Sequence, residues 1–224
     1  IFFTSAIWFD KVIKMPDPTL DLSCLEYLVL GGSSISPEQK KRYNEFLKAH
    51  GANIRCSNGY GLSEACGACI VAPPEREDAA IGYPLPHIKV KIFDEQEKKF
   101  YDLADGPRTG VLYLNSPSVS SGKIDDTVFF ELEDVNGEDY LCTYDLVTVN
   151  EDGSLTCCGR ANRFFINNEG IRFDAGIAET CIGAQPDIEC CAIVPDYSKT
   201  LHDTVPSLYV QTATSGPLAV KVVQ

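Results

Sequence analysis

Residues 57–65 read Ser57-Asn58-Gly59-Tyr60-Gly61-Leu62-Ser63-Glu64-Ala65, and an earlier stretch reads Leu28-Val29-Leu30-Gly31-Gly32-Ser33-Ser34. Both stretches place glycines where backbone amides can approach a bound molecule closely. The later stretch adds a flat aromatic ring, a hydroxyl that can donate to an anionic oxygen, and a carboxylate that can bind a divalent cation. Together they predict a binding site to which backbone and side chains both contribute.

The composition is that of a globular protein with an acidic surface. The chain has 224 residues, of which 44% are apolar, and a formal net charge of −13. This length fits one large domain, or one domain with part of another. The negative charge opposes nonspecific binding to nucleic acid and to anionic membranes. No apolar run approaches the roughly 18 residues of a membrane span, and the start lacks a signal-peptide pattern, so we expect a cytoplasmic protein.

The ten cysteines are poorly spaced for a metal site. Cys66-Gly67-Ala68-Cys69 is a lone C-x-x-C pair, whereas Cys157-Cys158 and Cys190-Cys191 are adjacent doublets. A zinc ribbon needs two pairs that converge on one tetrahedron. Because most of the cysteines have apolar neighbours in sequence, we expect buried free thiols in a reducing compartment, with a redox or zinc role as the alternative.

The first quarter of the chain has the pattern of a βαβ unit. A strand at 25–30 runs into Gly31-Gly32, a helix begins at Ser36-Pro37-Glu38 and closes at Gly51, and a short strand at 52–56 enters a loop at 58–60. Ligands of such sheets bind beyond the carboxyl ends of the strands, where both glycine stretches lie. An earlier helix at 5–15 is ended by Pro16 and Pro18. Lys40-Lys41-Arg42 is interpreted as a solvated helix face.

The rest of the chain favours strands and hairpins. A turn at 150–153 joins the strands of a probable hairpin, and a change of pattern after Gly159-Arg160 places a domain boundary near 160–162, which divides the chain into 1–160 and 161–224. The remaining expected elements are strands at 88–93, 110–114, 140–149 and 154–158, a hairpin of 164–166 with 171–173, a short helix at 175–182 and a strand at 188–194.

In order and spacing these stretches resemble the nucleotide-binding core of the adenylate-forming enzymes, which include acyl-CoA synthetases, luciferases and the adenylation domains of peptide synthetases. Four further segments support the resemblance. Residues 81–86 are similar to the family's GxPxP, residues 110–119 to GEL…GPSV, residues 143–146 to TGDL, and Gly159-Arg160 to the start of the hinge motif GRxD. The resemblance implies a mixed α/β fold: the later part of the large N-terminal domain over 1–160, then the hinge and first half of the small C-terminal domain over 161–224.

The resemblance also implies a role for each motif residue. Taken singly, each residue also has an ordinary structural explanation, such as a turn, a core position or a surface charge; their shared order favours the site. The implied roles are Gly31, Gly32 and Ser33 lining the adenine and acyl pocket; Asn58 bordering the base; Tyr60 stacking on adenine between Gly59 and Gly61; Ser63 bonding the α-phosphate; Glu64 binding Mg²⁺; Asp145 accepting from the ribose hydroxyls; and Arg160 reaching the ribose and phosphate.

The activity implied is that of an ATP-dependent carboxylic acid–CoA ligase, which forms an acyl-adenylate and then an acyl thioester. Its cofactors and partners would be ATP or AMP, Mg²⁺, a small carboxylic acid, and coenzyme A or the pantetheine of a carrier protein. Two alternatives stay open: an adenylation domain that loads a carrier protein, and a degenerate homologue that acts as a binding module.

Several positions depart from the family pattern. Tyr144 replaces the glycine of TGDL, and Asn162 stands where the hinge aspartate is expected. The family's phosphate loop would precede Thr4, and its adenylating lysine would follow Gln224, so we expect little turnover from this chain alone. Ser33-Ser34 and Ala65-Cys66-Gly67 are expected to border the acyl pocket.

Overall fold

The computed structural model describes residues 1–212 except 16, 18, 34, 162, 167, 169–171, 184, 186 and 187. The chain divides into two compact units, Ile1–Cys158 and Gly159–Gln224, close to the boundary expected at 160. Whether these units correspond to the family's two domains stays a prediction. Pro16, Pro18, Ser34 and Asn162, which the sequence singled out, lie outside the described residues.

The first unit begins with a five-stranded sheet in the order β1-β2-β3-β4-β5. Strands β1, β2 and β3 are parallel, whereas β3 with β4 and β4 with β5 are antiparallel. The parallel half contains the predicted βαβ unit, because α2 connects β2 to β3. The bounds are β1 Phe2–Ser5, β2 Leu28–Gly31, β3 Cys56–Leu62, β4 Gly67–Val71 and β5 Tyr83–Pro84.

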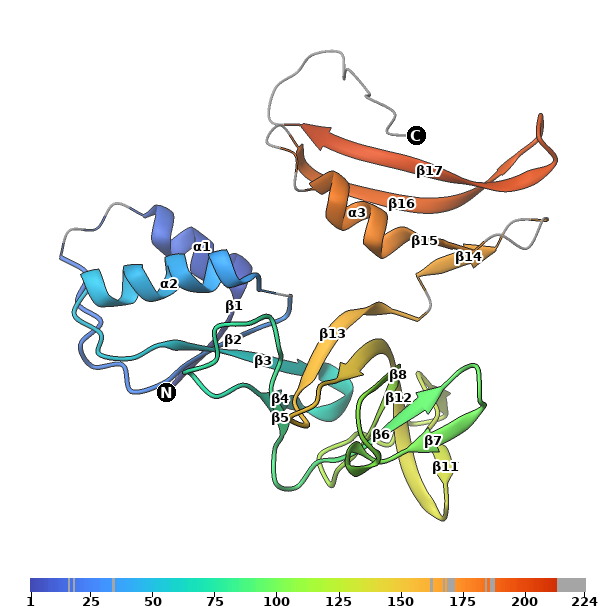
Figure 1. Ribbon diagram of the computed structural model, residues 1–224, viewed down its shortest axis with the longest axis horizontal. Coiled ribbons are helices and arrows are strands. Elements are labelled where there is room, and N and C mark those ends of the chain that lie inside the picture. Colours follow the sequence, from blue (N-terminus) through green and yellow to red (C-terminus); the bar gives the residue numbers. More distant parts are fainter. Residues whose placement is uncertain are drawn as a thin grey trace. The chain divides into compact units, whose positions relative to one another are not determined.

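Helices α1 (Ala6–Lys14) and α2 (Pro37–Ala49) pack on this sheet (Figure 1). Ser5 caps α1, and Ser36 with Gln39 forms a capping box at the start of α2, which satisfies backbone amides that the first helical turn leaves free. Leu28 and Leu30 of β2 are buried against both helices. The helices therefore hold β2 rigidly where it runs into Gly31.

A second, antiparallel sheet completes the first unit. Its order is β11-β12-β8-β6-β7, and β13 also pairs with β12. Ile92, Leu112, Leu114 and Val147 lie in its buried core. The bounds are β6 Lys89–Asp94, β7 Lys99–Tyr101, β8 Arg108–Asn115, β11 Glu133–Val135, β12 Glu138–Val149 and β13 Leu155–Arg160, with a small separate pair β9 Lys123–Ile124 and β10 Thr127–Val128 and the 3₁₀ turns η1 Ser63–Ala65 and η2 Leu103–Asp105.

In its described residues, the second unit contains two hairpins and a helix. Strands β14 (Phe164–Ile166) and β15 (Arg172–Asp174) are antiparallel, as are the long strands β16 (Ile188–Ser198) and β17 (Asp203–Thr212). Helix α3 (Ala175–Gly183) packs against β16. Within the described parts of the chain, no helix is both long and apolar enough to cross a membrane.

Two predicted elements need correction. The strand expected at 52–56 begins only at Cys56 and runs to Leu62. Asn58, Gly59 and Tyr60 therefore belong to β3 and not to a loop, because β3 pairs with β2 as far as Asn58 and then with β4 from Gly59 onward. The predicted strand at 188–194 extends to Ser198 and pairs with β17, which the sequence did not predict.

Two expectations about burial are also wrong. Lys40 is only 2% exposed, because it shares the inward face of α2 with Tyr43 and Leu47. The ten thiols are free, but most of them are not buried. Cys56 and Cys69 are buried; Cys142, Cys157 and Cys191 are partly exposed; and Cys24, Cys66, Cys158, Cys181 and Cys190 are exposed.

Candidate functional site

The two glycine stretches meet at the carboxyl ends of the parallel strands. Ser5 at the end of β1 pairs with Gly31 at the end of β2, and Leu30 pairs with Asn58 of β3. An added Cβ at Gly31 would lie 2.9 Å from the carbonyl oxygen of Gly59, so the two stretches are in direct contact. This edge is where open α/β sheets bind their ligands.

A groove of about 570 Å³ opens at this edge. Its volume is in the range of small-molecule binding sites. Six of the residues predicted for the site line it: Gly31, Gly32, Gly59, Tyr60, Gly61 and Ser63.

Tyr60 connects the groove to the second sheet. Its hydroxyl donates a hydrogen bond of 2.6 Å to Oδ2 of Asp145, which lies on β12. The two residues are 85 positions apart in sequence. Burial, and then the negative charge and hydrogen bond of Asp145, raise the pKa of Tyr60 well above its usual range, so the phenol stays a donor. The structure thus brings the predicted adenine platform and the predicted ribose acceptor together.

The backbone around Asp145 forms a bulge. The register between β12 and β8 shifts between Cys142 and Leu146, and Tyr144 inside this interval has a positive φ of 57°. Thr143 stabilises this bulge, because its hydroxyl donates to the carbonyl of Leu112 at 2.8 Å and accepts from the amide of Asp145 at 3.1 Å. Bulges of this kind re-aim side chains near functional sites.

The predicted phosphate and metal residues lie on η1. Ser63 is exposed at the groove, and Glu64 is partly buried. The amide of Ser120 donates to the Glu64 carbonyl at 2.8 Å, which brings the segment that follows β8 against this turn. Among the described residues, no three His, Cys, Asp or Glu side chains gather as metal ligands. A single carboxylate is the donor set expected for Mg²⁺ that is held largely by the phosphates of a nucleotide.

Other predicted residues do not line the groove. Ser33, Glu64 and Asp145 lie outside its lining. Asn58 is only 3% exposed, and its amide nitrogen donates to the carbonyl of Ala80 at 3.0 Å. Ala65 is buried in the core, whereas Cys66 and Gly67 line the groove. Arg160 is exposed and belongs to the second unit.

The groove also includes residues that the sequence did not suggest. Phe3, Thr4 and Ser5 of β1 contribute one wall, and Ala68 of β4 another. The apolar run at the start of the chain is the only signal for β1. It is too short to predict a strand without knowledge of its partner β2.

Comparisons with known proteins place the chain in a family. The family model described as AMP-binding enzyme matches residues 1–122. The chain is 28% identical over 179 residues to the 4-coumarate–CoA ligase-like protein 6 of Oryza sativa subsp. japonica, covering 78% of this chain and 28% of that protein. It is 31% identical over 173 residues to the 2-succinylbenzoate–CoA ligase of Escherichia coli K12, covering 76% and 32%. It is 29% identical over 192 residues to the nonribosomal peptide synthetase apvA of Aspergillus terreus, covering 80% and 20%. The chain therefore spans about a third or less of each of these relatives.

Solved structures show the same fold. ATP-bound MatB of Rhodopseudomonas palustris aligns with a TM-score of 0.69 at 16% identity, covering 96% of this chain and 41% of that one. The McyG A-PCP structure in complex with phenylalanyl-adenylate aligns with a TM-score of 0.67 at 19% identity, covering 96% and 35%. The match of the family model over more than half of the sequence, together with this fold, shows that the chain belongs to the AMP-binding family of adenylate-forming enzymes.

Proposed function

We propose that this chain supplies the nucleotide half-site of a carboxylic acid–CoA ligase. The single observation that supports this most directly is the 2.6 Å contact of Tyr60 with Asp145 at the carboxyl edge of the parallel strands. A purine can lie against the Tyr60 ring, and a carboxylate beside the ring is placed to accept from the hydroxyls of the attached ribose.

The other site residues are assigned to the phosphate end. Ser63, exposed at the groove, would donate to the α-phosphate of ATP, and Glu64 would hold the Mg²⁺ that accompanies the phosphates. Bound Mg²⁺ would neutralise charge on the phosphate oxygens. Gly31, Gly32, Gly59 and Gly61 would form the floor of the site, and Arg160 is assigned to the ribose and phosphate by the family resemblance.

In the proposed reaction, the substrate carboxylate attacks the α-phosphorus of ATP and pyrophosphate leaves. The thiol of coenzyme A then attacks the acyl carbonyl, and AMP leaves with the bonding electrons. The residues of this chain would bind and orient the nucleotide in both steps. Rotation of the small domain about residues 160–162 would separate the two half-reactions.

An adenylation domain that loads a carrier protein is the second candidate. The peptide synthetase among the relatives favours it, and it would use the same nucleotide site with carrier-bound pantetheine as the thiol. A binding module without turnover is the third candidate, supported by the replacement of glycine by Tyr144. An AMP titration separates this module from the two enzymes, because a module that no longer uses the nucleotide is expected not to bind AMP.

Calorimetric titration with AMP tests the nucleotide assignment. We expect wild-type chain to bind AMP, and Asp145→Asn to weaken binding about tenfold, because a charge-assisted hydrogen bond to the ribose is lost. Asp139→Asn is the matched control, since Asp139 is exposed on the same strand and carries the same charge. Equal affinities for all three proteins would remove Asp145 from the site.

A further inference from the structure

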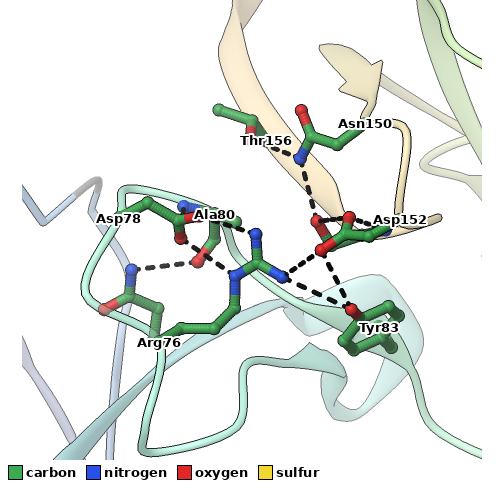
Figure 2. Close-up of polar contacts among 9 residues, drawn as sticks. Arg76, Asp78, Ala80, Tyr83, Asn150, Asp152 and Thr156 are labelled. Carbon is green, nitrogen blue, oxygen red and sulfur yellow. Dashed lines mark hydrogen bonds and ion pairs between the residues drawn. The ribbon is translucent and has the colours of Figure 1, made fainter.

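Arg76 joins two segments of the first unit through its side chain (Figure 2). It lies between β4 and β5, and its side chain is only 18% exposed. One side pairs with Asp78 through Nε and a terminal nitrogen, at 2.9 and 2.6 Å. The other terminal nitrogen donates to Oδ2 of Asp152 at 2.6 Å and to the Tyr83 hydroxyl at 3.3 Å. We call Arg76, Asp78, Tyr83 and Asp152 the Arg76 clasp.

The clasp is fixed at its far end by the turn between β12 and β13. Asp152 also accepts from the amide and the hydroxyl of Ser154, at 3.0 and 2.6 Å. Asn150 donates to Ser154 and Thr156, which closes the same turn. The Ser154 and Arg76 hydrogen bonds hold the pKa of Asp152 well below its usual range, so the ion pair is complete at neutral pH.

The near end of the clasp reaches the first sheet. Asp78 accepts from the amide of Ala80 at 3.1 Å, and the carbonyl of Ala80 accepts from the side chain of Asn58 on β3. Backbone hydrogen bonds of 2.8 Å from Ile81 to Leu155 and from Leu155 to Gly82 lie between the two ends. The clasp therefore connects the sheet that carries Tyr60 to the hairpin β12–β13.

Asp145 lies on that same hairpin, so its distance from Tyr60 depends on how the hairpin is held. We propose that Arg76 is a positioning residue for the nucleotide site: by fixing the β12–β13 turn against the 76–83 segment, it holds Asp145 at the place where ribose hydroxyls meet it. The two parallel hydrogen bonds of an arginine–carboxylate pair fix the orientation of the two groups, in addition to the attraction between their charges. This inference rests on the proposed function.

The test compares AMP with 2′,3′-dideoxy-AMP, which lacks the hydroxyls assigned to Asp145. Wild-type chain is expected to prefer AMP about tenfold. In Arg76→Gln this preference should fall to about twofold or less, while the affinity for dideoxy-AMP changes less than about twofold. Asp152→Asn should behave alike, because it breaks the clasp from the other side, and Arg76→Lys should recover part of the preference.

Arg55→Gln is the matched control, since Arg55 pairs with Glu77 beside the clasp but both partners are largely exposed. It should keep the wild-type preference. Equal weakening of both ligands in Arg76→Gln would indicate a merely structural role and overturn the inference, as would an unchanged preference. Failure of wild-type chain to bind AMP would instead overturn the proposed function, and this inference with it.

Discussion

At the scale of single residues, Lys40 is the position where sequence and structure disagree most. Its Nζ is buried without a hydrogen-bond partner among the described residues, and burial lowers its pKa. An unpaired buried ammonium opposes folding, because desolvation disfavours the charged form.

Lys40→Met should therefore stabilise the chain, by about 1–2 kcal/mol at neutral pH. Urea unfolding measures the difference, with the exposed neighbour Lys41→Met as control. Since the pKa of Lys40 is lower in the folded than in the unfolded chain, the unfolded state binds more protons between the two values. Wild-type stability should rise with pH in that interval, and this rise should be absent in Lys40→Met. A less stable Lys40→Met would show that Lys40 has a stabilising partner.

Tyr144 has a strained backbone. Its φ is 57° in the bulge before Asp145, and the residue is 51% exposed. A left-handed conformation costs a residue with a side chain about 1–2 kcal/mol. Glycine removes this strain, but its greater conformational entropy in the unfolded chain offsets part of the gain in stability. We expect Tyr144→Gly to raise the free energy of unfolding by up to about 1 kcal/mol. Thr148→Gly, on the same strand at ordinary extended φ, should lower it. Equal losses in both variants would contradict the strain.

At the scale of elements, the glycines of β3 are required by neighbouring strands. A Cβ on Gly61 would lie 2.0 Å from the carbonyl oxygen of Gly67 on β4. Gly61→Ala should therefore destabilise the chain by about 1–3 kcal/mol in urea unfolding. Gly183→Ala in α3, where the nearest atom lies 3.9 Å away, should be neutral or stabilising. A neutral Gly61→Ala would show that β4 moves away easily.

The sequence predicted the elements with local signals. Ser36 as N-cap and Pro37 in the first turn predict the start of α2, and the turn at 150–153 predicts the hairpin of β12 with β13; both are confirmed. It missed β17 because Pro206 argues against a strand. Pro195 and Pro206 face each other in a two-stranded hairpin, where the missing donors are tolerated.

The candidate site was predicted as residue types and not as geometry. Tyr60 and Asp145 were each singled out, but their hydrogen bond depends on how two sheets meet, which no local pattern encodes. The Arg76 clasp was not predicted for the same reason. Arg76 and Asp152 are 76 positions apart, and in the sequence each has the pattern of an ordinary charged surface residue.

At the scale of the whole molecule, the two units differ in their cores. Both buried clusters lie within Ile1–Cys158, whereas the buried hydrophobic residues described in the second unit are Ala161, Ala175 and Ile193. Brief trypsin digestion should therefore cut first beyond Cys158, at sites such as the exposed Arg160, and leave a resistant fragment of the first unit. Mass spectrometry identifies the fragment, and early cuts within residues 1–158 would contradict this difference.

Tyr60 and Asp145 are proposed to bind an adenine nucleotide together. A crystal structure of the chain with AMP tests this proposal most directly. We expect the adenine against the Tyr60 ring, and a ribose hydroxyl within hydrogen-bond distance of Asp145. AMP bound away from the groove at β1–β4, or ordered there without contact to either residue, would contradict it.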